Sequence, residues 1–161
     1  MKTRSRIGGM FAAALAVAVT LVAPVQAHHS FAMYNIRITT VFTAVVTRVD
    51  PAPNHLAIFF APMNAERKNV ERDAKGEPIV WSVEMGGSAQ MARQGISVNA
   101  FPPGTVFSVA LHPLRNGDTA GTREGAMFKC PDKAPPAPGK HCDSVEGHTA
   151  FGEGGLPVAT P

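Results

Sequence analysis

Histidine is the residue type in this sequence best suited to chemistry, because neutral imidazole is a common ligand of transition metals near neutral pH. An amino-terminal histidine can bind Cu(II) through both its α-amine and its ring, and one or two further imidazoles complete the tetragonal nitrogen site that copper prefers. We therefore expect a copper site formed by His28, His29, His55 and His112. The alternative is a solvated N-terminal pair, with His55 and His112 merely capping backbone groups at strand ends.

The first 27 residues have the layout of a cleavable secretory signal peptide. Three basic residues lie within the first six positions, an apolar run covers residues 10–22, and residues 25–27 supply a cleavage site. A membrane anchor is the alternative, but the apolar run is shorter than the roughly 20 residues of a spanning helix. We predict cleavage after Ala27, which leaves His28 with a free α-amine in a periplasmic or secreted protein without a membrane span.

Removal of the leader changes the charge balance of the chain. It leaves 134 of the 161 residues, which suffices for one domain with a single core. The whole chain has 15 basic and 12 acidic residues, but three of the basic ones lie in the leader, so the mature chain carries 12 of each. The pI of 9.1 therefore gives no support to a nucleic-acid partner.

Motifs of common enzyme classes are missing from the sequence. It contains no G-x-S-x-G elbow, no P-loop, no H-E-x-x-H and no C-x-x-C-H haem attachment. We expect a protein that is not an enzyme.

The two cysteines, Cys130 and Cys142, flank a proline-rich segment without apolar periodicity. An even pair in an exported protein favours a disulfide, here one that closes a surface loop. A thiolate metal pair is the alternative, although the close C-x-x-C spacing is missing. We divide the chain into the signal peptide (1–27), a barrel domain (28–129) and a disulfide-tied loop and tail (130–161), and expect loose order from about Gly152.

Short segments with strand character recur along the mature chain. The predicted strands cover residues 39–49, 55–60, 79–85, 106–111 and 124–129. The charged residues 64–77 are expected to form a solvated loop, and Ser88 is expected to cap a short helix that ends at Gln94, with Gly95 as its stop. This element order predicts an all-β fold with one short helix, a small five-stranded OB-like barrel. A small open sandwich is the alternative.

Trp81 and Glu84 lie three positions apart on one predicted strand, so they face opposite sides of it. We expect Trp81 to join the core. Glu84 is expected to pair with Arg93 or to be exposed.

A series of short motifs follows a fixed order through residues 28–129. They are His28-His29-Ser30-Phe31, Thr43-Ala44-Val45-Val46, Pro53-Asn54-His55, Trp81-Ser82-Val83-Glu84, Met91-Ala92-Arg93-Gln94-Gly95, Pro103-Gly104-Thr105 and His112-Pro113-Leu114-Arg115-Asn116-Gly117. In this order they resemble DUF6152, a family of small exported bacterial proteins of unknown function. The family's Asn-Pro-His turn is permuted here, Ala57 replaces an aromatic residue, and Asn116 replaces an acid. The resemblance implies no established activity.

The expected function is that of an exported periplasmic binding or accessory protein that binds copper through its N-terminal histidine cluster, with a protein partner still to be identified. A metal-free barrel that binds a protein or a small ligand is the first alternative. A copper-dependent oxidoreductase is the second, and it needs an open coordination position and a substrate surface.

Overall fold

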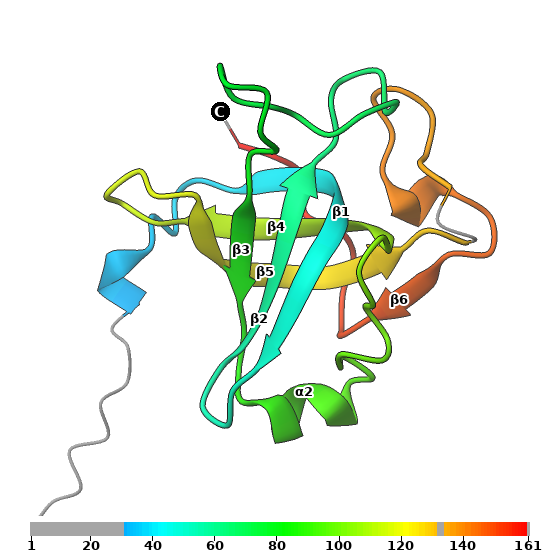
Figure 1. The fold of residues 1–161 in the computed structure, drawn as a ribbon. Coiled ribbons are helices and arrows are strands. Elements are labelled where there is room, and N and C mark those ends of the chain that lie inside the picture. Colours follow the sequence, from blue (N-terminus) through cyan, green and yellow to red (C-terminus); the bar gives the residue numbers. More distant parts are fainter. Residues whose placement is uncertain (1–30, 132–133, 161) are drawn as a thin grey trace, which may run out of the picture. The chain divides into compact units, whose positions relative to one another are not determined.

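A computed structural model describes residues 31–131 and 134–160 (Figure 1). Its elements in chain order are the 3-10 turn η1 (Phe31–Met33), the strands β1 (Thr40–Pro51), β2 (Leu56–Pro62) and β3 (Trp81–Glu84), the helix α2 (Ser88–Arg93), the strands β4 (Val106–Pro113) and β5 (Ala120–Lys129), the 3-10 turn η3 (Cys142–Ser144) and the strand β6 (Thr149–Phe151). In these residues no helix is long and apolar enough to cross a membrane.

The strands form one sheet in the order β3-β2-β1-β4-β5-β6, and a parallel pairing of β3 with β5 closes the first five strands into a barrel. Closure pairs the edges that an open sheet would expose. The predicted all-β, five-stranded OB-like barrel with one short helix is confirmed, and the open sandwich is wrong.

Period-two alternation determines what each strand buries. On β1, Phe42, Ala44 and Val46 point into the main core, whereas Thr43 and Val45 point outward. Strand β4 is buried at every position from residue 106 to residue 111. Its outward side is covered because a second, smaller cluster around the cysteine-linked loop packs against it.

The helix starts differently from the prediction. Gly87, not Ser88, occupies the N-cap position, and it makes no side-chain cap. The Ser88 hydroxyl donates instead to the carbonyl oxygen of Ala52 at 2.6 Å, which ties the helix to the turn between β1 and β2. A side chain on Gly87 would collide with the carbonyl of Pro53, so this close approach explains the glycine. Gly95, with φ of +77°, ends the helix as predicted.

Strand β6 was not predicted, because three residues are too few to show periodicity. It pairs with β5, and its buried Phe151 packs against Phe101 with ring centroids 4.7 Å apart. The tail after Gly152 is also attached to the barrel. The N–H of Ala126 donates to the carbonyl of Gly155 at 3.3 Å, and further along the N–H of Thr160 donates to a carbonyl of the barrel domain at 3.0 Å.

Candidate functional site

Closure of the barrel brings His55 and His112 closer together than a flat sheet would. Strands β2 and β4 both run antiparallel to β1, so the start of β2 and the end of β4 would lie far apart in a flat sheet. In the barrel, Glu84 on β3 pairs with Thr122 on β5, which in turn pairs with His112 on β4. Two strand spacings, about 10 Å, therefore separate the backbones of His112 and Glu84, and Glu84 contacts His55.

His55 is held by a carboxylate. Its Nδ1 lies 3.0 Å from Oε1 of Glu84, and the hydroxyl of Tyr34 donates to Oε2 of the same carboxylate at 2.9 Å. Both carboxylate oxygens therefore have a donor. Burial first, and the Glu84 contact second, raise the pKa of Tyr34 to about 12, so its hydroxyl keeps its proton at physiological pH.

The Glu84 contact selects one tautomer of the neutral His55 ring. An ionised carboxylate only accepts hydrogen bonds, so in the neutral ring Nδ1 carries the hydrogen and Nε2 carries the lone pair. Metal-binding histidines show the same arrangement, in which the second ring nitrogen donates to a carboxylate that orients the ring. The two side chains are 37% and 34% exposed, so the pair is accessible from solvent.

His112 is held by a different set of groups. Its Nδ1 donates to the carbonyl oxygen of Ile38 at 2.9 Å, and its Nε2 lies 3.6 Å from Oε2 of Glu124. The Thr39 hydroxyl donates to that same oxygen at 2.8 Å. Each of the two histidines thus has its own carboxylate partner.

Of the four predicted copper ligands, two lie within the described residues. His55 and His112 face one outer band of the barrel, whereas His28 and His29 lie outside the described residues. Within residues 31–131 and 134–160, no three His, Cys, Asp or Glu side chains are close enough to hold a metal ion.

Sequence reasoning missed the carboxylate partners. Glu84 was expected to pair with Arg93 or to be exposed, but it binds His55 and Tyr34 instead. Tyr34 and Glu84 are 50 positions apart in the chain, so only the fold can bring them together. The one signal that the sequence offered was the outward position of Glu84 on its strand, next to the buried Val83.

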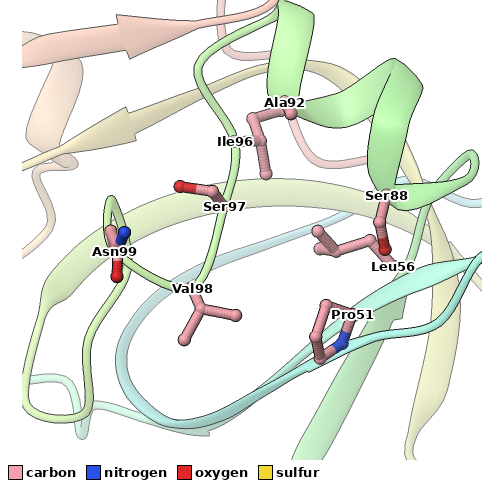
Figure 2. A pocket seen from close by; sticks show the side chains of 8 residues that line it. All are labelled: Pro51, Leu56, Ser88, Ala92, Ile96, Ser97, Val98 and Asn99. Carbon is pink, nitrogen blue, oxygen red and sulfur yellow. The ribbon is translucent and has the colours of Figure 1, made fainter.

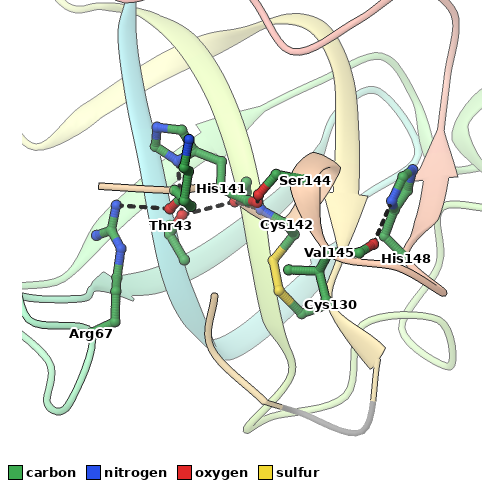
Figure 3. Close-up of a disulfide and its surroundings, with 10 residues drawn as sticks. Thr43, Arg67, Cys130, His141, Cys142, Ser144, Val145 and His148 are labelled. Atoms are coloured by element: carbon green, nitrogen blue, oxygen red, sulfur yellow. Dashed lines mark hydrogen bonds between the residues drawn. A yellow bond between two sulfur atoms is a disulfide. The ribbon is translucent and has the colours of Figure 1, made fainter. Parts of the chain in front are cut away.

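A second polar network lies under the cysteine loop (Figure 3). Cys130 and Cys142 form a disulfide, as predicted, so the thiolate-pair alternative is wrong. The backbone N–H of Cys142 donates to the Ser108 hydroxyl at 2.9 Å, and this hydroxyl lies 2.8 Å from that of Thr43, which contacts Nδ1 of His141 at 2.8 Å. Thr43 and Ser108 are almost fully buried, which excludes a nucleophilic role in the folded protein.

The pKa of His141 is lowered, mainly because burial disfavours its charged form and secondly because the guanidinium of Arg67 is nearby. The unfolded chain, with a pKa of about 6.5, takes up a proton that the folded state resists. The neutral His141 side chain therefore stabilises the fold fully above about pH 6.5, and this stabilisation is lost as the pH falls below that value.

We expect His141→Gln to reduce the acid sensitivity of the fold, because glutamine can still hydrogen bond to Thr43 but does not titrate. Thermal unfolding at pH 7.5 and pH 5 measures this. The fall in midpoint between the two values should be smaller in the variant than in the wild type. His148→Gln, at an exposed position, is the control, and an equal fall in all three proteins contradicts the assignment.

An apolar pocket of about 280 Å³ lies beside helix α2 (Figure 2). Its lining residues come from the end of β1, the start of β2, the helix and the loop after it: Pro51, Leu56, Ser88, Ala92, Ile96, Ser97, Val98 and Asn99. The lining carries few polar groups, so the pocket suits a small apolar ligand or a single apolar side chain.

Comparison with known proteins gives one match. Residues 15–124 match the model of a family described as a family of unknown function, DUF6152. No curated protein and no solved structure gives a significant match.

Proposed function

Since this chain belongs to the DUF6152 family, whose function is unknown, its role has to be argued from its own residues, and we propose that it is an exported, periplasmic accessory protein that binds Cu(II) at its mature N-terminus. The α-amine and the ring of His28 provide a chelate. Nε2 of His55 provides a third nitrogen, and His29 lies next to the chelate in the sequence. Nitrogen ligands of this kind favour Cu(II) over Zn(II) and Mn(II) by the usual stability order.

The observation that carries this proposal is the hydrogen-bonded series Tyr34–Glu84–His55. Tyr34 belongs to the segment that directly follows the N-terminal histidines, and its hydroxyl is bound to the carboxylate that orients His55. Six positions separate His28 from Tyr34, and three of them form η1, so the span is shorter than the roughly 20 Å of a fully extended segment. The amine can therefore approach the pair of Glu84 and His55 without any long connecting segment.

His112 has a secondary place in this proposal. Its ring is oriented by Ile38 and faces Glu124, not Glu84. We therefore assign the copper to His28 and His55, and we expect replacement of His112 to change copper affinity less than replacement of His55.

A metal-free ligand-binding barrel remains the second candidate function, and the apolar pocket beside α2 favours it. Its lining residues Leu56 and Ile96 are also part of the hydrophobic core, so the pocket has an apolar floor. Binding of a small apolar ligand there is compatible with copper binding at the N-terminus, because the two sites share no residue.

The first requirement of the copper proposal is processing at His28. We expect mass spectrometry of the protein isolated from the exported fraction of its host to give a chain that begins at His28, because residues 1–27 have the signal-peptide layout. An intact leader, or cleavage at another position, contradicts the proposal because the amino-terminal chelate could not form.

A copper titration of the chain that begins at His28 tests the proposal itself. We expect one equivalent of Cu(II), bound more tightly than by a free His-His-Ser peptide. Affinity should fall as the pH is lowered through the histidine range, because protons compete for the same nitrogens. Affinity no greater than that of the free peptide would mean that the fold contributes nothing to the site.

A further inference from the structure

Two side-chain atoms that can each bind a metal ion face each other on the outer side of β4 and β5. Nε2 of His112 is 3.6 Å from Oε2 of Glu124. The carbonyl oxygen of Ile38 can only accept, so the 2.9 Å contact with Nδ1 places the proton of the neutral ring on Nδ1 and the lone pair on Nε2. Two electron-pair donors therefore face each other with no hydrogen atom between them.

Both ligand atoms are held in place by other groups. The Thr39 hydroxyl donates to Oε2 of Glu124 at 2.8 Å, and the backbone of Thr39 exchanges hydrogen bonds with Thr160 of the tail. His112 pairs with Thr122, two positions from Glu124 on β5, so the two side chains are diagonal neighbours on one face of the sheet. Hydrogen bonds from outside the ligand set orient metal-binding histidines and carboxylates in the same way.

We infer that His112 and Glu124 form half of a binding site for a tetrahedral divalent transition-metal ion such as Zn(II), with water in the other two positions. Imidazole nitrogen and carboxylate oxygen are ordinary zinc ligands, and two atoms each about 2.1 Å from a tetrahedral ion lie about 3.4 Å apart. The observed separation of 3.6 Å needs only a small adjustment. The side chains are 18% and 32% exposed, so solvent and ions can enter.

The zinc site is independent of the proposed copper site. It uses neither His55 nor Glu84, and the two carboxylates lie on different strands, β3 and β5. With only two protein ligands it should bind zinc less tightly than a structural site with four. A protonated His112 would instead form a simple ion pair with Glu124, so the two alternatives differ in whether zinc binds.

Calorimetric titration with zinc chloride at pH 7.5 distinguishes the zinc site from a simple ion pair between His112 and Glu124. The protein is the mature chain with the α-amine of His28 acetylated, which removes the amino-terminal chelate and leaves the barrel unchanged. We expect one zinc ion per chain. His112→Asn and Glu124→Gln should each lower the zinc affinity by at least about tenfold, because changes to groups that only orient metal ligands already lower affinity by that factor. The amide of His112→Asn can still donate to the Ile38 carbonyl, and Glu124→Gln keeps an oxygen for Thr39.

His148→Asn is the matched control. Nδ1 of His148 lies 2.8 Å from the carbonyl of Val145, and its ring forms no ion pair within the described residues. Loss of zinc affinity in the two site variants but not in the control supports the site. Equal zinc affinity in all four proteins overturns it and leaves only the ion pair. Glu124→Gln decides the question if His112→Asn disturbs the fold, and copper binding by the mature chain should survive both changes.

Discussion

Acetylation of the His28 α-amine weakens Cu(II) binding by about 100-fold or more. The acetyl group converts the amine into an amide nitrogen, which removes one ligand and the chelate that it forms with the ring. Changes to groups that only orient metal ligands already cost 10- to 100-fold in affinity, so loss of a direct ligand should cost at least as much. Competitive titration with a copper chelator measures the two affinities.

The barrel side of the site is tested by His55→Ala and Glu84→Gln. We expect His55→Ala to lower the copper affinity because it removes a direct ligand. Glu84→Gln should lower the affinity about tenfold, because a glutamine that turns its amide nitrogen toward Nδ1 no longer fixes the ring tautomer. His148→Asn, at an exposed position in the tail, should leave copper affinity unchanged. If the acetylated chain, His55→Ala and the mature wild type all bind alike, copper does not use an organised site.

Removal of the disulfide by Cys130→Ala with Cys142→Ala lowers the free energy of unfolding by at most about 3 kcal/mol. The bridge joins residues 12 positions apart, and the chain-entropy model assigns about that value to a loop of this size. The prolines of the loop already restrict the unfolded chain, which reduces the effect. Denaturant unfolding of the oxidised protein and the double variant measures the difference.

Copper binding serves as the control for the disulfide variant. The N-terminal site and the bridge share no contact among the described residues, so copper affinity should stay within about threefold while stability falls. A fall of less than about 0.5 kcal/mol in the free energy of unfolding would show that apolar packing in the smaller core cluster, and not the covalent bond, keeps the loop in place.

The barrel was predictable because its strands are long enough to show alternation. Strand β1 spans twelve residues, and its inward and outward positions could be assigned as far as Val46. An irregularity in its pairing with β2 between Val46 and Arg48 then turns Val49 toward the main core, against the alternation. The helix start was misassigned because Ser88 has the chemistry of a cap, whereas the close packing of Gly87 against Pro53 decides the geometry. Strand β6 stayed hidden because its three residues contain one buried side chain.

The histidines of the site were predictable as ligand types, but their surroundings were not. His55 and His112 could be placed at strand ends, yet the stagger of the closed barrel decides that Glu84, Thr122 and His112 share a row. That stagger depends on the pairing of β3 with β5, which leaves no mark in either strand alone. The roles of Tyr34 and Glu124 follow from the same long-range pairing.

Electron paramagnetic resonance of the mature chain loaded with one equivalent of Cu(II) tests the central claim most directly, because couplings to nitrogen count the nitrogen ligands. We predict a tetragonal copper spectrum with couplings from the α-amine, the His28 ring and the His55 ring. In His55→Ala one imidazole coupling should disappear. Identical spectra for the wild type, His55→Ala and a free His-His-Ser peptide would contradict the proposal that the barrel takes part in copper binding.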